Sequence, residues 1–261
     1  MNLDQAVVVI TGAASGIGAT AARSFASQGA RLVLADARED ALKATADELA
    51  ASGTEVAWAV TDVTKDDQVE ALMDLAIERF GAINVVLPSA GIFRDSFMVR
   101  VKEGRVTRKM STEDFRAVID VNLTGTFLTL REAAARMIDG GHEGVLFTVS
   151  SINKEGELGQ SNYAATKTAV ALWPKLLAGE LHAQGVQGIR VVGVAPGYVE
   201  TPILEGMPEA ALARVLANVP IGRLIRPHEI TDLLIHVCQN DAIHATTLEI
   251  SGGALASGMP K

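Results

Sequence analysis

The sequence predicts a doubly wound α/β fold, in which helices cover both faces of a parallel sheet. Short runs rich in Val, Ile, Leu and Ala alternate along the chain with longer segments that carry apolar residues at helical spacing. The short runs are apolar throughout rather than at every second residue, which is typical of strands covered on both faces. No linker-like shift in composition, low-complexity tract or internal repeat divides the chain. We therefore expect a single domain over residues 1–261.

Seven apolar runs are the expected strands, and helical patterns lie between most of them. The expected strands are residues 6–11, 31–35, 55–60, 83–87, 145–149, 189–194 and 247–250. The expected helices are residues 17–28, 40–51, 66–80, 112–138, 162–183 and 228–238. Because a strand, a helix and a parallel strand connect by a right-handed crossover, this order predicts about seven strands in one sheet with helices on both faces.

Two segments break the alternation, and each follows a predicted strand. Residues 93–110 hold six basic residues against two acidic ones, and residues 98–107 alternate apolar and charged residues about Glu103-Gly104, which predicts a small hairpin. Residues 201–220 include a short helical pattern at 208–217, and we expect them to form a substrate lid. Its apolar surface comes from Ile203, Leu204, Met207 and Leu212. In open α/β sheets ligands bind beyond the carboxyl ends of the strands, so both segments are candidates for the rim of a site.

Composition excludes several classes of function. A net charge of −8 and a pI of about 5.2 argue against a nucleic-acid-binding protein. No apolar run is long enough to span a bilayer, and the first residues lack a basic signal region, so we expect no membrane span or signal peptide. One cysteine, Cys238, excludes an internal disulfide, and we expect a cytoplasmic protein. The five histidines are dispersed, so no metal site is expected, and no Gly-x-Ser-x-Gly elbow supports serine hydrolysis.

A glycine-rich turn follows the first strand. Gly12, Ser15, Gly16, Ile17 and Gly18 lead directly from that strand into a helix. Glycines at such a turn let the backbone approach a pyrophosphate, and the helix N-terminus attracts the anion. This is the arrangement of a Rossmann-like dinucleotide site.

Two acids follow the next two strands. Asp36 is placed where a carboxylate accepts hydrogen bonds from a ribose 2′-hydroxyl and repels a 2′-phosphate, which favours NAD over NADP; the alternative is a loop acid with no ligand. Asp62, followed by Val63, either reaches an adenine ring or caps the next helix. After the fourth strand, Ala90 and Gly91 are small enough for a cofactor to pass close to the backbone.

Tyr163 and Lys167 are the strongest chemical signal. They are four positions apart within a helical pattern, so their side chains share one face. A free phenol titrates near 10, and a nearby ammonium is expected to lower that pKa toward the neutral range. The pattern therefore predicts a tyrosine that transfers a proton; the alternative is a surface tyrosine beside a lysine.

Three further polar residues are candidates for the same site. Ser150 and Ser151 end the fifth strand, where a hydroxyl can hold a substrate carbonyl oxygen. Asn122 lies in a predicted helix although asparagine is a poor helix former, which suggests a role such as anchoring a water beside Lys167; a solvent-facing asparagine is the alternative.

In order and spacing, these motifs resemble the short-chain dehydrogenase/reductase family over essentially the whole chain. Residues 159–167 look most similar to its 3-oxoacyl-[acyl-carrier-protein] reductase branch. The resemblance implies that Tyr163 is the acid/base, that Lys167 lowers its pKa and holds the nicotinamide ribose, and that Asn122 supports a proton-relay water. It also implies a serine that orients the substrate, a homotetramer, and a nicotinamide site that includes Pro196, Gly197, Val199 and Thr201.

The chain departs from that family in ways that bear on function. Pro88-Ser89-Ala90-Gly91 replaces the usual Asn-Asn-Ala-Gly, and the basic segment at 93–110 is longer than usual. The loop before Tyr163 is one residue short, so Ser151 aligns by its place in the pair and Ser150 by its distance from Tyr163. We take Ser151 as the catalytic serine.

Three functions follow from these observations. The first is an NAD(H)-dependent oxidoreductase that interconverts a secondary alcohol and a ketone. The second is a 3-oxoacyl-[acyl-carrier-protein] or 3-oxoacyl-CoA reductase, in which the basic segment steers an acidic carrier or CoA phosphates. In the alternative reading that segment is a solvated or subunit-contacting hairpin. The third function is a non-catalytic nucleotide-binding regulator. Asp36 favours the first, because many carrier-protein reductases of this branch use NADPH.

Overall fold

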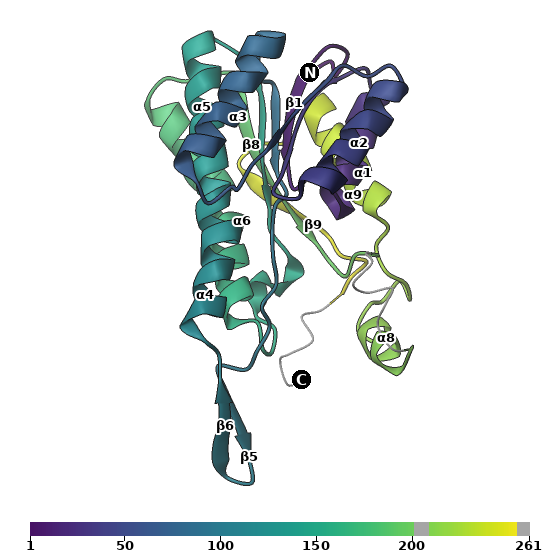
Figure 1. The fold of residues 1–261 in the computed structure, drawn as a ribbon, viewed down its shortest axis with the longest axis vertical. Coiled ribbons are helices and arrows are strands. Elements are labelled where there is room, and N and C mark those ends of the chain that lie inside the picture. The colour runs from purple at the N-terminus through teal and green to yellow at the C-terminus, as the bar shows by residue number, and fades with distance from the viewer. Residues whose placement is uncertain (201–208, 255–261) are drawn as a thin grey trace.

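The computed structural model describes residues 1–200 and 209–254 (Figure 1). Its central feature is a seven-stranded sheet with the order β3-β2-β1-β4-β7-β8-β9, in which every neighbouring pair is parallel. The order runs outward in both directions from β1 and β4, so the crossovers place helices on both faces. This confirms the predicted single-domain, doubly wound fold.

The predicted elements are found with small shifts at their ends. The strands are β1 (Val7–Thr11), β2 (Arg31–Asp36), β3 (Val56–Val60), β4 (Val85–Pro88), β5 (Val99–Lys102), β6 (Arg105–Lys109), β7 (Gly144–Val149), β8 (Ile189–Pro196) and β9 (Thr246–Ile250). The helices are α1 (Gly16–Ala26), α2 (Glu39–Ala51), α3 (Asp66–Phe80), α4 (Thr112–Ile119), η1 (Asp120–Thr124), α5 (Gly125–Gly140), η2 (Ile152–Glu155), α6 (Ser161–Ala183), α8 (Glu209–Leu216) and α9 (Pro227–Gln239).

Strand side chains alternate between two cores. Val8 and Ile10 of β1 join the core under α1, α2 and α9, whereas Val7 and Val9 join the core under α3, α5 and α6. Figure 1 shows these two groups of helices on opposite sides of the sheet. All four side chains are fully buried, which explains why β1 is apolar at every position rather than at alternate ones.

The helix predicted at 112–138 is present, but one π-helical turn lies within it. Residues Thr112–Ile119 form α4, residues Asp120–Thr124 form a π-helical turn, and α5 then continues to Gly140. The insertion of one π-helical turn coincides with Asn122, whose side chain bonds a distant backbone segment. The spacing of apolar residues did not indicate the π-helical turn, because apolar residues continue through it.

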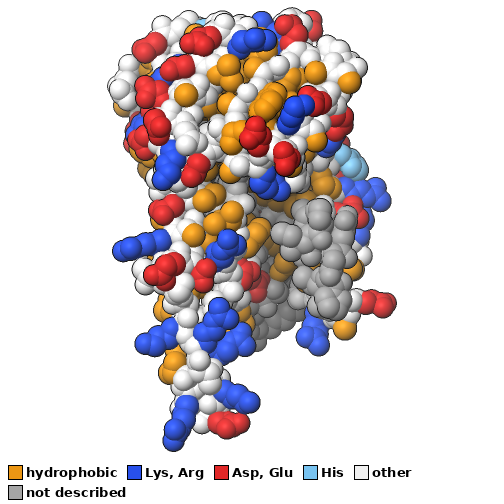
Figure 2. Space-filling view, viewed as in Figure 1, with side chains coloured by type: hydrophobic (Ala, Val, Ile, Leu, Met, Phe, Trp, Pro, Cys, Tyr) orange, Lys and Arg blue, Asp and Glu red, His pale blue; other side chains and the backbone are white. Residues whose placement is uncertain are grey.

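The predicted hairpin at 98–107 forms as β5 and β6, which project from one end of the molecule (Figure 1). Glu103 and Gly104 both have positive φ, as a two-residue hairpin turn requires. Arg100 faces Arg108 across the strands, and basic side chains gather at this end of the surface in Figure 2. Every residue of both strands is exposed.

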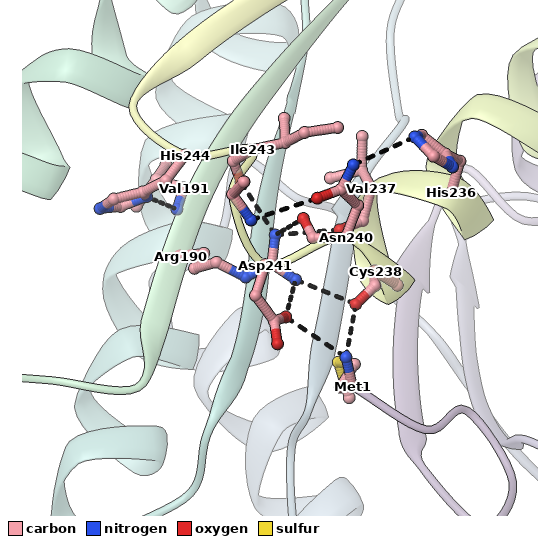
Figure 3. A network of polar contacts seen from close by, with 11 residues as sticks. Met1, Arg190, Val191, His236, Val237, Cys238, Asn240, Asp241, Ile243 and His244 are labelled. Atoms are coloured by element: carbon pink, nitrogen blue, oxygen red, sulfur yellow. Dashed lines mark hydrogen bonds and ion pairs between the residues drawn. The ribbon is translucent and has the colours of Figure 1, made fainter.

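The opposite end of the sheet is tied to the N-terminus by Arg190 (Figure 3). The Arg190 guanidinium donates to the carbonyl oxygens of Val237, Cys238 and Ile243 at 2.8–3.0 Å, which satisfies the C-terminal end of α9. The amino group of Met1 donates to the same Cys238 oxygen at 2.8 Å. The start of the chain is thereby joined to the C-terminal end of α9.

Candidate active site

The turn after β1 is packed so closely that two of its positions admit only glycine. At Gly12, where φ is +69°, an added Cβ would lie 2.7 Å from the Ala90 nitrogen, and at Gly18 it would lie 2.3 Å from the Gly12 oxygen. The Ser89 hydroxyl fixes the neighbouring turn by donating to the Thr11 oxygen at 2.6 Å. The glycine turn and residues 89–91 therefore meet at the carboxyl edge of the sheet.

The N-terminus of α1 opens into this region without a side-chain cap. Ser15 is the N-cap, but its side chain makes no capping hydrogen bond, and the first turn carries no acid. The first amide groups of the helix that begins at Gly16, including those of Ile17 and Gly18, therefore point out of its end. This fits the pyrophosphate of a dinucleotide, whose charge the helix dipole attracts.

Asp36 ends β2 and is only 8% exposed. One of its oxygens accepts from the Ala14 amide at 3.1 Å, and the other accepts from the Arg38 amide at 3.0 Å and from Arg38 Nε at 3.1 Å. Arg38 also donates to the Ser15 hydroxyl at 2.8 Å. The sequence analysis did not identify Arg38, although an arginine two residues after the acid that ends β2 could have indicated a contact with it.

Asp62 serves a local turn. Its Oδ1 accepts from the Thr64 amide at 3.0 Å and from the Thr64 hydroxyl at 2.7 Å. Burial raises the pKa of Asp62, but the hydrogen bonds from Thr64 outweigh it, so its pKa is lowered. The N-cap of α3 is Lys65, so Asp62 is not itself the cap. Val63 is buried against Gly125, where an added Cβ would lie 2.6 Å from the valine side chain.

Ser151, Tyr163 and Lys167 form one cluster at the ends of β7 and α6. Tyr163 is hydrogen-bonded to Ser151, and Lys167 Nζ lies 5.3 Å from the centroid of the Tyr163 ring. Lys167 Nζ donates to the Val149 oxygen at 2.8 Å. All three side chains are at most 8% exposed.

The titration behaviour of this cluster differs from expectation. Burial raises the pKa of the Tyr163 phenol above its ordinary value; the hydrogen bond with Ser151 lowers it, and the charge of Asp95 raises it further. Burial lowers the pKa of Lys167 to about 8. Burial is thus the largest influence on the Tyr163 pKa, and Lys167 is not among its causes, so the lowering of that pKa by Lys167 stays a prediction.

The two adjacent serines point to different partners. The Ser150 hydroxyl donates to the Lys167 carbonyl oxygen at 2.7 Å, and Ser150 is 2% exposed, so it anchors the N-terminal part of α6 to the sheet. The Ser151 hydroxyl accepts from the Asn153 amide at 3.1 Å and contacts Tyr163. Of the two serines, Ser151 is the one beside the tyrosine.

Asn122 is fully buried in the π-helical turn, and its side chain pairs with one backbone residue. Its Oδ1 accepts from the Ile92 amide at 2.8 Å, and its Nδ2 donates to the Ile92 oxygen at 3.0 Å. Gly91 lies beside it, since an added Cβ there would be 3.5 Å from Asn122 Oδ1. Asn122 thus fixes the chain after β4 and is not solvent-facing.

The segment that Asn122 holds runs directly against Tyr163. The Phe93 ring stacks on the Tyr163 ring, with centroids 4.5 Å apart and an interplanar angle of 26°. The Ser96 amide donates to the Gly159 oxygen at 2.8 Å, and Asn162 Nδ2 donates to the Arg94 oxygen at 3.0 Å. Phe93 was not predicted, because nothing in its local sequence distinguishes it from a loop aromatic.

The turn after β8 completes the edge. Gly197 donates to the Ile250 oxygen at 3.0 Å, and an added Cβ would lie 2.8 Å from the Ser251 Cα. Val199, three residues after Pro196, belongs to a small buried cluster with Ile225 and Ile230, and Ile17 of α1 packs against this cluster. Thr201, together with Ile203, Leu204 and Met207 of the predicted lid, lies outside the described residues. The short helical pattern predicted at 208–217 corresponds to α8 (Glu209–Leu216).

No group of three or more His, Cys, Asp or Glu residues suited to a metal ion occurs within 1–200 and 209–254. No helix in the same ranges is long and apolar enough to cross a membrane.

Comparison with known proteins places the chain in a family. Residues 6–211 match the family model for short chain dehydrogenases. The chain is 34% identical to a 3-oxoacyl-[acyl-carrier-protein] reductase of Thermotoga maritima, covering 97% of this chain and 99% of that protein. It is 35% identical to a cis-4-hydroxycyclohexanecarboxylate dehydrogenase of Sinomonas cyclohexanicum, covering 97% of both. A short-chain dehydrogenase/reductase structure from Brucella melitensis, named a glucose/ribitol dehydrogenase, superposes with a TM-score of 0.85 at 29% identity over 97% of both chains.

Proposed function

Because this chain belongs to the short-chain dehydrogenase family, and is therefore an oxidoreductase that acts on hydroxyl and keto groups, we propose that it interconverts a secondary alcohol and a ketone with NAD(H). Tyr163 is the acid/base of this reaction. The observation that carries the proposal is the buried cluster of Ser151, Tyr163 and Lys167 at the carboxyl edge of the sheet.

The residues around the glycine turn fit a dinucleotide, because the turn excludes side chains and the α1 N-terminus is uncapped. When bound, the nicotinamide cofactor accepts or supplies the hydride. The proposed cofactor-binding residues are Gly12, Ser15, Gly16, Ile17, Gly18, Asp36, Asp62, Val63, Ala90, Gly91, Tyr163, Lys167, Pro196, Gly197, Val199 and Thr201. Asp62 is included for its place after β3, and Thr201 for the family resemblance.

Tyr163 handles the proton. Its raised pKa keeps the phenol protonated at neutral pH, so in the reducing direction it donates a proton to the carbonyl oxygen of the substrate. In the oxidising direction the phenolate that receives the proton needs a nearby positive charge, which Lys167 supplies while it is protonated, below its pKa of about 8. Ser151 orients the substrate oxygen, and Asn122 supports the site by holding Ile92.

The preference for NAD over NADP is supported by the buried carboxylate of Asp36, which repels a 2′-phosphate. Arg38 works in the opposite direction, since its guanidinium is 59% exposed beside that carboxylate and is suited to a phosphate. We expect Asp36 to determine the preference for NAD, because Arg38 could bind a 2′-phosphate only after its hydrogen bonds with Asp36 were broken.

Parallel fluorescence titrations with NADH and NADPH test the cofactor, using Trp58 and Trp173 as reporters. We expect tighter binding of NADH in the wild type, and a shift toward NADPH of about tenfold or more in Asp36→Ser, which keeps Arg38 but removes one like charge beside the phosphate. Tighter binding of NADPH by the wild type would contradict the NAD assignment.

Turnover of a panel of ketones and secondary alcohols tests the chemistry. Tyr163→Phe should lower kcat by about 10²- to 10⁴-fold while NADH still binds. Ser151→Ala should lower turnover more than Ser150→Ala, whose main effect should be on stability because its hydroxyl anchors α6. Full activity in Tyr163→Phe would refute the proton-transfer role.

We further propose that the enzyme is a cytoplasmic homotetramer. Large apolar side chains are exposed on the long helices that the family uses for assembly, and burying them between subunits would remove them from water. These side chains are Phe115 on α4, Phe127 and Ile138 on α5, and Leu172 and Leu176 on α6.

A second candidate is reduction of a 3-oxoacyl thioester on a carrier protein or on CoA. The observation in its favour is the exposed hairpin with its basic face, in a chain whose relatives include carrier-protein reductases. Neutralising Arg100, Lys102 and Arg105 together should raise KM for an acyl substrate and weaken its salt dependence. If neither changes, the hairpin does not steer the substrate and this candidate loses its support.

A further inference from the structure

The aromatic ring of Phe93 covers one face of the Tyr163 ring. The two rings are stacked, with centroids 4.5 Å apart and an interplanar angle of 26°. Tyr163 is only 8% exposed, whereas Phe93 is 47% exposed. On this side of the tyrosine, the ring of Phe93 therefore occupies space that water would otherwise fill. The separation lies in the range that aromatic pairs favour, so the contact is specific in its geometry.

The stack is held by hydrogen bonds on both sides of Phe93 along the chain. The residue before Phe93 is paired by the buried side chain of Asn122. On the other side, Asn162 Nδ2 donates to the Arg94 oxygen at 3.0 Å, and Asn162 Oδ1 accepts from the Tyr163 amide at 2.8 Å. Asn162 is fully buried. One side chain thus ties the backbone beside Phe93 to the backbone of Tyr163, so the two rings are fixed relative to each other.

The chemistry of the phenol depends strongly on its exclusion from water. Burial is the largest cause of the raised pKa of Tyr163; the hydrogen bond with Ser151 lowers that pKa, and the charge of Asp95, two residues after Phe93, raises it. The ammonium of Lys167, one turn along α6, lies 5.3 Å from the centroid of the tyrosine ring. Because burial has the largest effect, a ring that keeps water from the phenol influences how readily it gives up its proton.

We propose that Phe93 is a positioning residue for proton transfer by Tyr163: its ring keeps water from one face of the phenol and holds the phenol in one orientation. This inference rests on the proposed function, in which Tyr163 is the acid/base, and adds a residue to it. A small displacement of a reacting group slows the reaction even when the group itself is intact. Removal of the Phe93 ring therefore affects catalysis through Tyr163.

Steady-state kinetics of Phe93→Ala, with a ketone from the panel that the wild type reduces, measure the orienting effect. We expect kcat to fall by about tenfold or more while KM for NADH stays close to that of the wild type, because a misplaced proton donor slows the chemical step. Phe93→Tyr keeps an aromatic ring and should retain most of the activity. A wild-type kcat in Phe93→Ala would overturn the inference.

Ionisation of Tyr163 measures the shielding directly. The chain has two tyrosines, so in Tyr198→Phe the ultraviolet absorbance of tyrosinate reports Tyr163 alone. After a rapid jump to alkaline pH, and before the chain unfolds, adding Phe93→Ala to this background should increase the amount of tyrosinate at each pH. Water that replaces the ring stabilises the phenolate, so the pKa of Tyr163 moves down toward its ordinary value of about 10. Equal amounts of tyrosinate with and without Phe93→Ala would overturn the shielding role.

The matched control in both measurements is Phe97→Ala. It removes a ring of similar exposure, 43%, from the same segment, where the ring lies 5.3 Å from the Arg100 guanidinium. Neither kcat nor tyrosinate formation should change in this control, and changes equal to those of Phe93→Ala would refute a specific role for the stack.

The titration needs no turnover, so the inference and the proposed function can fail separately. Unchanged tyrosinate formation in Phe93→Ala, together with an inactive Tyr163→Phe, would remove only the role of Phe93. Full activity of Tyr163→Phe would remove the proposed function, and with it the role of Phe93 in proton transfer, whatever the titration shows.

Discussion

Replacing Asn122 by alanine should be unusually destabilising for a polar helical residue. The side chain is fully buried and satisfies both the amide and the carbonyl of Ile92, at 2.8 Å and 3.0 Å. Its removal leaves the amide and the carbonyl of half-buried Ile92 without this partner, each at a cost of about 1 kcal/mol or more. We therefore expect the free energy of unfolding to fall by about 2 kcal/mol or more.

Urea denaturation of the wild type and of Asn122→Ala measures this loss from the shift in midpoint at unchanged slope. Thr129→Val on α5 is the matched control, because Thr129 is equally buried and its hydroxyl donates only to the Gly125 oxygen within the helix, at 2.8 Å. The control should lose about 1 kcal/mol. Catalytic activity of Asn122→Ala should also fall, since Ile92 begins the segment that carries Phe93 against Tyr163.

A loss no larger than that of Thr129→Val would refute this reasoning. It would mean that Ile92 is paired by other groups when the asparagine is removed, and that the π-helical turn is not maintained by this contact. A large loss of stability with unchanged activity would instead separate the turn from the site.

Three further predictions follow from local geometry. Gly18→Ala should weaken NADH binding by about tenfold or more, since its Cβ would lie 2.3 Å from the Gly12 oxygen, whereas Gly179→Ala has open space on α6 and should stabilise the protein by about 0.5–1 kcal/mol in thermal unfolding. Cys238 is buried with its pKa raised to about 12, so a disulfide reagent at pH 8 should label the unfolded chain but not the native one. The Lys167 pKa falls from 10.5 to about 8 on folding, so between these pH values the unfolded chain binds a proton that the folded chain has released. The free energy of unfolding of the wild type, relative to that of Lys167→Met, should therefore rise by up to about 3 kcal/mol from pH 8 to 10.5. A fall over that window would contradict the pKa shift.

The local sequence was sufficient to predict most of the sheet and the glycine turn. A strand such as β1, with Val7 to Ile10 buried on both faces, produces an apolar run that is visible without its neighbours. Gly12 and Gly18 are required by contacts within the turn and with the adjacent one, so their spacing was informative. Tyr163 and Lys167 share a helix face, so their proximity needed no tertiary information.

The parts that sequence did not predict depend on contacts between distant residues. The π-helical turn exists where Asn122 meets Ile92, thirty residues earlier. The choice between Ser150 and Ser151 depends on which hydroxyl points toward Tyr163 and which toward the Lys167 carbonyl. The sequence leaves this open, because the loop before Tyr163 is one residue short and either serine can be aligned with the family serine. The role of Arg38 could not be predicted, because it depends on the hydrogen bonds of its guanidinium with Asp36 and Ser15.

The same distant contacts explain how the chain accommodates the exposed basic hairpin of β5 and β6. Residues before the hairpin are held at three points, by Asn122 on Ile92, by Asn162 on the Arg94 oxygen and by the Gly159 oxygen on Ser96. The exposed strands β5 and β6 begin only after the last of these points. Changes in the hairpin are therefore mechanically separated from Phe93 and Asp95, so this segment can vary in length and charge while the surroundings of Tyr163 stay fixed.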